Sequence, residues 1–263
     1  MAKQPPFSAA IEIDNGVITE SDPTTLFRIQ HIGRGDREMY DRRFNAAFHF
    51  DAYLFDVSFK DCLAAEFQVN PEFGSAEAAF DEVQKYAPVI GRLPTVLRSR
   101  LKTVWIHKGR MDFGGGNENL LIHTDRTELY ESKGILEETL VHETAHTSLQ
   151  EHNTAQGWLA AQEADGTFIS TYARDYAERE DVAESFVCYL AVRYRSRGVI
   201  SPQAAEIMRT IPNRIAYFDK QGFAMHPLTR MSDAAAQRML ELAALAEQNP
   251  FYTGATRSPL ENE

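Results

Sequence analysis

Cysteine is scarce in this chain, and acidic residues outnumber basic ones. Only Cys62 and Cys188 occur among the 263 residues, which excludes a disulfide scaffold and a cysteine-rich zinc module. We expect both cysteines to be small buried apolar residues. The 27 Lys and Arg stand against 38 Asp and Glu, for a formal charge of −11. We therefore expect neither nucleic acid nor a membrane surface as a partner, because binding to either needs concentrated positive charge.

Long apolar runs are also missing. No segment approaches the roughly 18 uninterrupted apolar residues of a membrane helix, and the amino terminus, Met1–Pro6, has no apolar run of signal-peptide length. We expect a soluble chain, either cytoplasmic or secreted after processing, with compartment and oligomeric state left open. The 43% of hydrophobic and 11% of aromatic residues are enough for a substantial core.

The hydrophobic pattern changes from strand-like to helix-like along the first half of the chain. Over 25–70 apolar and polar residues alternate, which predicts strands and hairpins. Over 75–101 apolar residues recur every three or four positions, which predicts two helices separated at Pro94. Short apolar runs then predict strands at 103–107 and 119–123.

Helices dominate the predicted second half. The glycine run at 113–117 leads into a strand instead of a helix, so it predicts a flexible turn and not a phosphate-binding loop. A long helix is expected over 135–150, then an irregular stretch through Trp158 and a second helix over 180–194. Further helices are expected at 202–210, 213–218 and 232–247.

One short motif dictates chemistry by its residue types and spacing. His142 and His146 are four residues apart in the predicted helix, so both imidazoles lie on one face and can share a metal at roughly 2.0–2.1 Å each. Glu143 then lies beside the metal. Zinc lowers the pKa of a bound water toward ~7, and a neighbouring carboxylate can take its proton as the water attacks a carbonyl. The motif predicts a zinc hydrolase.

Catalytic zinc keeps three protein ligands, and two residues compete for the third place. Glu180 lies at the margin of an apolar helix face, with Glu184 one turn further as a carboxylate that can orient a ligating histidine. His152 follows His142 by ten residues, a spacing that requires a sharp turn at the position of Leu149. Leucine resists the left-handed conformation of such a turn, so we favour Glu180.

This pattern resembles the gluzincin branch of the zincin metallopeptidases. The resemblance implies zinc ligation by His142, His146 and Glu180, with Glu143 as general base. More narrowly, the segment 170–173 followed by Glu180-x-x-Ala-Glu-x-Phe resembles the catalytic end of the anthrax lethal factor type of metallopeptidase.

In that type a tyrosine shortly before the glutamate ligand helps to stabilise the oxyanion. Tyr172 matches by its setting, although it stands one residue further from Glu180 than that spacing places it, and Tyr176 is the alternative. The resemblance covers about 136–186, and no motif in the first hundred residues contributes to it.

The same resemblance implies an architecture. We expect one α+β zincin-like domain over 1–263, with a twisted mixed sheet, an active-site helix and a mostly helical C-terminal part. Within it, residues 1–70 are the β-rich part, 75–194 the metal-site core and 195–263 the helical part. Zincins pair extended substrate with the edge strand of the sheet, which by position is 119–123.

The expected function is a zinc-dependent metallopeptidase that acts on a peptide or protein, with Zn2+ as cofactor. Two alternatives stay open: a zincin-fold binding or scaffold protein whose metal site does not turn over, and a metal-dependent amidase with a non-peptide substrate. The presence of Glu143 argues against the scaffold, because a degenerate site is expected to lose its general base first.

Overall fold

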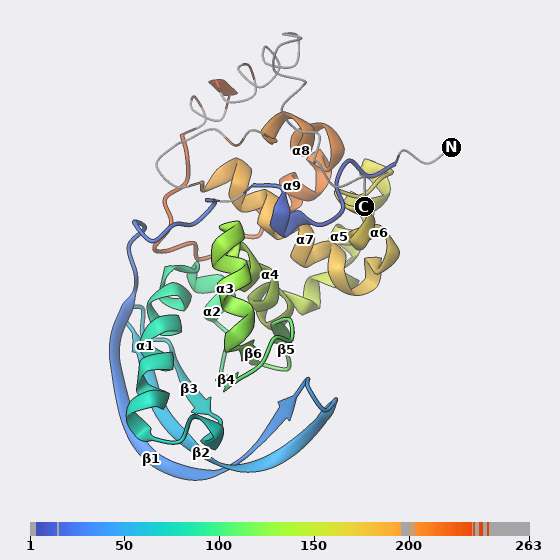
Figure 1. Cartoon of the computed structure of the whole chain (residues 1–263). Coiled ribbons are helices and arrows are strands. Elements are labelled where there is room, and N and C mark those ends of the chain that lie inside the picture. The colour runs from blue at the N-terminus through green and yellow to red at the C-terminus, as the bar shows by residue number, and fades with distance from the viewer. Residues whose placement is uncertain are drawn as a thin grey trace.

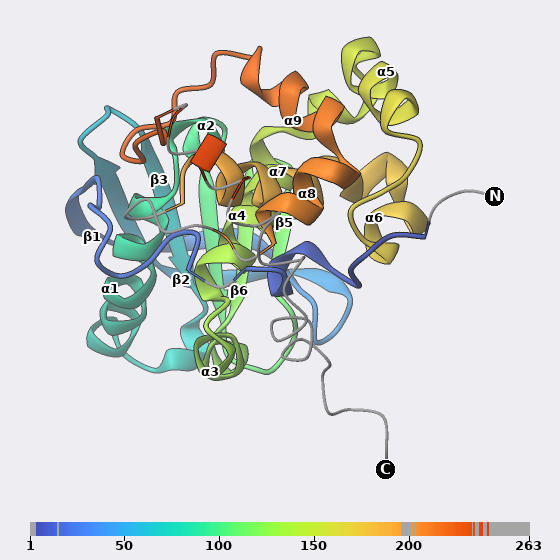
Figure 2. The same ribbon diagram turned by 90° about the horizontal axis from the view of Figure 1, so that it is seen from above.

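The computed structural model describes residues 4–14, 16–195, 201, 203–232, 234, 237, 238 and 241. It shows an α+β fold in which six strands form one mixed sheet, in the order β1-β2-β3-β4-β6-β5. The helices gather on one side of this sheet (Figures 1 and 2). The α+β class expected from the sequence is confirmed. Among the described residues, no helix is both long and apolar enough to cross a membrane.

A long hairpin begins the sheet. β1 (Leu26–Asp41) and β2 (Ala46–Phe59) pair antiparallel, and β3 (Ala64–Val69) continues the meander, which confirms the strands predicted from alternation. β2 pairs with β3 only over residues 53–58, so the distal half of the hairpin runs past β3 and curls back toward β5 (Figure 1). A small second core forms there from Met39, Phe50, Ala52 and Leu54, packed with Trp105.

The other half of the sheet is parallel except at its edge. β4 (Thr103–His107) pairs parallel with both β3 and β6 (Asn119–His123), as their predicted positions allow. β5 (Gly114–Gly116) pairs antiparallel with β6. A two-residue turn joins them, and its residues Asn117 and Glu118 have φ of 50° and 60°, the positive values of a type I′ hairpin.

Two predictions about this region are wrong. The glycine run at 113–117 is not a flexible turn, because its middle three residues form β5. The edge strand of the sheet is β5 and not 119–123: β6 lies between β4 and β5, and all five of its residues are buried. The side-chain pattern could not predict the pairing of β5 with β6, since the three glycines of β5 have no side chains.

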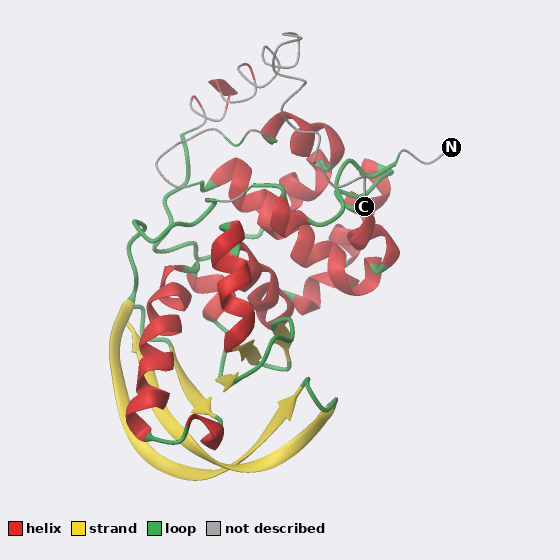
Figure 3. Ribbon diagram, viewed as in Figure 1, coloured by secondary structure: helices red, strands yellow, loops and turns green. Residues whose placement is uncertain are grey.

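Four helices follow the strands or connect them. α1 (Ala76–Arg92) begins at Ser75, whose hydroxyl accepts a hydrogen bond from the Ala78 N–H, and α2 (Thr95–Arg98) follows Pro94, as predicted. α3 (Thr124–Lys133) was not predicted. α4 (Leu136–Ser148) contains the His-Glu-x-x-His motif and matches the predicted helix within two residues. Figure 3 shows the helices and the sheet as separate layers. The main core lies between these helices and the sheet and continues among the later helices.

The remaining helices form the C-terminal half of the helical layer. They are α5 (Gln156–Asp165), α6 (Thr171–Asp175), α7 (Ala177–Arg193), α8 (Ala204–Thr210) and α9 (Pro212–Asp219). The stretch expected to be irregular through Trp158 instead forms the 3-10 helix η3 (Gln150–Thr154) and α5, in which Trp158 is buried. α7 begins three residues before the predicted 180. Most of the helix predicted at 232–247 lies outside the described residues.

A buried ion-pair network joins three of these helices. The Arg214 guanidinium of α9 lies 3.0 Å from an Asp165 carboxylate oxygen at the end of α5 and 2.9 Å from one of Asp181 in α7. It also donates to the carbonyl oxygen of Thr167. Removing one partner of such a network typically costs about 3–5 kcal/mol, because it leaves a buried charge without compensation. The network fixes the start of α7.

The first described residues cross the helical layer as an N-terminal strap, which we define as residues 7–14, 16 and 17. The N–H groups of Thr171 and Tyr172 donate to carbonyl oxygens of the strap, and its own N–H groups donate to two buried carboxylates. Glu138 of α4 accepts from residues 16 and 17, and Glu184 of α7 accepts from residue 10. The strap thereby ties α4, α6 and α7 together.

The two cysteines behave differently. Cys188 is buried in α7, as expected, whereas Cys62 is exposed in the turn between β2 and β3 with a φ of 65°. The prediction for Cys62 is wrong because the strand pattern was extended through a turn that the structure places at that residue.

Candidate metal centre

Helix α4 sets the spacing of the two motif histidines. It follows Gly134, whose left-handed φ of 66° ends α3, and its first turn carries Glu137 and Glu138, which favour a helix N-terminus. No proline or glycine interrupts it. One turn of helix separates His142 from His146, and their Nε2 atoms lie 3.1 Å apart, on the side where α4 packs against α7.

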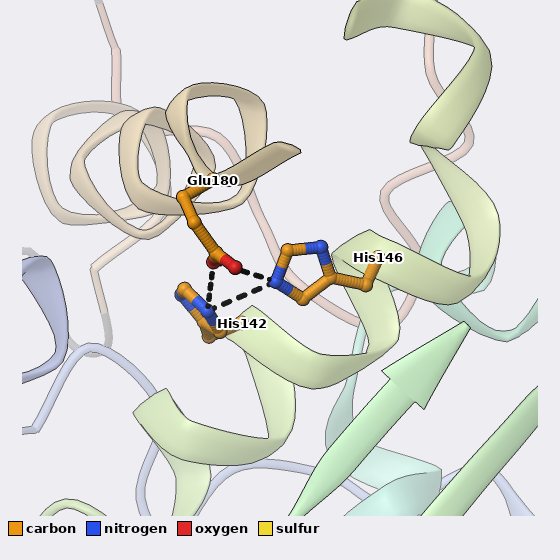
Figure 4. Close-up of side chains that lie close together, drawn as sticks. All are labelled: His142, His146 and Glu180. Atoms are coloured by element: carbon orange, nitrogen blue, oxygen red, sulfur yellow. Dashed lines mark hydrogen bonds and ion pairs between the residues drawn. The ribbon is translucent and has the colours of Figure 1, made fainter. Parts of the chain in front are cut away.

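Glu180, in the first turn of α7, completes a group of three. Its Oε2 lies 2.9 Å from Nε2 of His146 and 3.2 Å from Nε2 of His142 (Figure 4). All three side chains are buried. Burial opposes ionisation of Glu180, but hydrogen bonds and charge from the two histidines outweigh it and hold its pKa well below its usual range. The third member is therefore a carboxylate.

The donor set and its dimensions fit zinc. Two imidazoles and one carboxylate are a common ligand set of catalytic zinc, which leaves a fourth position open. Ligand atoms at about 2.0–2.1 Å from a tetrahedral ion are about 3.3–3.4 Å from one another, and the separations here are 3.1, 2.9 and 3.2 Å. An outward shift of a few tenths of an ångström opens the triangle to that size, so these residues can hold the ion.

Glu184 lies behind His142, one helical turn after Glu180. Its Oε1 is 3.3 Å from Nδ1 of His142, and its Oε2 accepts from the Ser170 hydroxyl at 2.5 Å and from the Ala10 N–H at 2.7 Å. Burial lowers the pKa of His142, but hydrogen bonds to the two glutamates outweigh it and raise that pKa to about 10. The carboxylate is thus in a position to orient the imidazole and make it a better ligand.

The competing third ligand, His152, lies elsewhere. Leu149 ends α4 with a φ of −115°, not in the left-handed conformation that a return to the motif requires. The chain continues into η3, where Nδ1 of His152 lies 2.6 Å from the Tyr217 hydroxyl and its ring packs edge-on against Phe223. The structure brings Glu180 and not His152 to the histidine pair.

The three residues border a cavity of about 330 Å³. Glu143 and Tyr172 also line it, whereas Tyr176 does not; it is 59% exposed and packs edge-on against Tyr172. Burial and the nearby Glu180 carboxylate raise the pKa of Tyr172 to about 12. The Tyr172 hydroxyl therefore keeps its proton at neutral pH. The roles of Glu143 and Tyr172 stay predictions.

Charged residues that the sequence did not single out line the rest of this cavity. Arg126 lies 2.6 Å from Asp112, and Lys133 lies 3.0 Å from Glu12 of the strap. Arg42, at the tip of the β1–β2 hairpin, donates to the carbonyl oxygens of residues 112 and 113. The hairpin, the residues just before β5, α3 and the strap supply these walls from distant parts of the chain, so no local motif signalled them.

Comparison with known proteins adds no relative to this picture. No protein-family model matches the chain. No curated protein and no solved structure matches it either.

Proposed function

We propose that this protein is a zinc-dependent metallopeptidase with a zincin-like arrangement of sheet and active-site helix. One observation carries the proposal: two imidazole nitrogens and a carboxylate oxygen converge within 3.2 Å of one another at the wall of a cavity. Glu143, the next residue after His142, lines the same cavity. His142, His146 and Glu180 are the proposed ligands, and a peptide or protein is the proposed substrate.

Each cavity residue has a proposed role. When bound, zinc supplies a Lewis acid that lowers the pKa of a coordinated water toward about 7. Glu143 takes the proton of the attacking water and passes it to the leaving amine. Tyr172 donates its hydroxyl proton in a hydrogen bond to the oxyanion. Glu184, held by Ser170 and Ala10, keeps His142 oriented.

The unpaired edge of β5 is the proposed support for an extended substrate. Among the described strands, β5 pairs only with β6 and is the edge of the sheet nearest the motif helix. Thr147 of α4 accepts from the Gly116 N–H and donates to the Asn119 carbonyl, which fixes the β5–β6 hairpin to α4. A peptide added to this edge by strand pairing lies beside Glu143.

Glu143→Gln tests the proposed catalytic role. The amide keeps the size of the side chain but cannot take a proton, so we expect the variant to retain wild-type zinc content and to lose at least about 100-fold in hydrolysis of a peptide library. Cleavage of the peptides is measured by mass spectrometry, and the zinc content of the same protein sample is measured by metal analysis. Wild-type activity in the variant would contradict the role of Glu143. Zinc retention without cleavage in the wild type would favour a non-catalytic metal protein.

A further inference from the structure

A second cavity, of about 350 Å³, lies on the face of the sheet away from α4. Trp105 and Leu121 are register partners on β4 and β6, so their side chains share one face. Their neighbours Val104 and Leu120 point to the opposite face, into the main core beneath the helices. The cavity is lined by Trp105, Leu121, Asn119 and the glycines of β5, together with Tyr40 and Arg42 from the hairpin.

β5 separates this cavity from the metal centre. A Cβ built on Gly115 would overlap the backbone carbonyl oxygen of Glu143 in α4, whereas one on Gly114 meets the Arg42 guanidinium and one on Gly116 meets open space. The two faces of β5 therefore point to α4 and to the second cavity. Arg42 lines both cavities, so the two share a wall at the tip of the hairpin.

Side chains of an extended peptide alternate between the two faces of the sheet it joins. A peptide paired with the edge of β5 thus directs alternate side chains toward the metal centre and toward the second cavity. The cavity has the volume of roughly ten water molecules, at about 30 Å³ each in the liquid, and can receive one large side chain.

The polar atoms of the cavity's aromatic residues are already used within the protein. The Trp105 indole N–H donates to the Gln68 side chain at 2.8 Å, and the Tyr40 hydroxyl donates to Asn45 at 2.6 Å. Among the described residues of the lining, Arg42 is the single charged one, and one of its nitrogens donates to two carbonyl oxygens. Besides the amides of Asn117 and Asn119, the lining offers a ligand ring surface and a planar guanidinium, both of which stack well on another aromatic ring.

We propose that the second cavity is a subsite that binds an aromatic side chain of the substrate polypeptide. The proposal rests on the proposed peptidase function, since it places the substrate on β5. It makes Tyr40 and Trp105 determinants of specificity that act by contact with the substrate and not on the reacting bond.

Binding of short peptides tests the proposal without turnover. The probes are capped pentapeptides with glycine at all positions except the third, which is Phe, Leu or Ala, titrated into the full-length Glu143→Gln chain. Of the two tryptophans, Trp158 is fully buried and Trp105 is half-buried, so a change in fluorescence reports on the cavity. We expect the Phe peptide to bind about tenfold more tightly than the Ala peptide, with Leu between them.

Variants of the lining and a matched control complete the test. Tyr40→Ala and Tyr40→Leu should each reduce the preference for Phe over Ala to less than about threefold, because the ring that stacks on the ligand is gone. Phe27→Ala removes an exposed aromatic on the same strand that does not line the cavity and should keep the full preference. Equal affinity for the Phe and Ala peptides, or a full preference in both Tyr40 variants, would overturn the subsite. Because binding is measured without hydrolysis, a failure of the peptidase proposal appears separately, as absent cleavage by the wild type.

Discussion

Gly115 is the residue at which β5 approaches the motif helix most closely. A Cβ there would overlap backbone atoms of Glu143, and neither strand nor helix backbone can move aside cheaply. We expect Gly115→Ala to lower the free energy of unfolding by about 1–3 kcal/mol, as overpacking does, and to reduce kcat by displacing Glu143. Urea unfolding and peptide hydrolysis measure the two effects.

Gly114 provides the control for this prediction. A Cβ at Gly114 meets the far end of the flexible Arg42 side chain and no backbone atom, so Gly114→Ala should cost less stability than Gly115→Ala. Equal unfolding free energies for Gly115→Ala and the wild type would show that the close approach of β5 to α4 does not constrain the site.

At the scale of single residues, the sequence indicated the proposed metal ligands but not the residues that hold them in place. An uninterrupted helix places His142 and His146 on one face. Because leucine disfavours the left-handed backbone conformation, Leu149 argued against His152 as the third ligand. The contact from Ala10 to Glu184 could not be foreseen, because it uses a backbone N–H 174 residues away, and every residue type except proline has that group. Arg42 was missed for a related reason: only the curl of the hairpin brings it to the cavity.

At the scale of elements, the N-terminal strap depends on a buried carboxylate. Both Gly16 and Val17 donate to Oε1 of Glu138, at 3.0 and 2.8 Å. Burial outweighs these hydrogen bonds and raises the pKa of Glu138 from its ordinary 4.5 to about 7. The folded state therefore holds this proton more tightly than the unfolded state, and the stability it contributes below pH 4.5 is lost as the pH rises through about 7.

Glu138→Gln should remove this pH dependence. The amide oxygen can still accept from the strap, and the side chain cannot ionise. We expect the free energy of unfolding of the variant, relative to that of the wild type, to increase between about pH 5 and about pH 8. Most of the increase falls between the ordinary glutamate pKa of 4.5 and the folded-state pKa of about 7. Urea unfolding at several pH values measures it. A relative stability that is constant over this range would contradict the assignment.

Elements with a side-chain pattern were predictable, and elements without one were not. The amphipathic sequence of α1 and the alternation in β1 to β3 follow from burial of one face. β5 consists of three glycines, and its turn, Asn117–Glu118, lacks the glycine that usually marks a type I′ hairpin. α3 is largely polar, with two buried residues, so it is held by its neighbours more than by an apolar stripe of its own.

At the scale of the whole molecule, the order of elements was predictable and the curvature of the sheet was not. The change in hydrophobic period along the chain predicts this order: strands first, then the motif helix, then further helices. The second cavity instead depends on the distal hairpin turning over the sheet, where a register shift between His31 and Gly33 interrupts the ladder and a separate small core forms. A bulge of this kind has no signature in the alternation of side chains.

The proposed zinc site takes its ligands from two helices, with Glu180 as the third ligand, 34 residues after His146 in the sequence. Its most direct test is the zinc content of the purified wild type, Glu180→Ala and His152→Ala chains after dialysis. We predict one tightly bound zinc per chain in the wild type and in His152→Ala, and loss of most of the metal in Glu180→Ala. A Glu180→Ala chain with wild-type zinc content, or a wild type that retains none, would contradict the account.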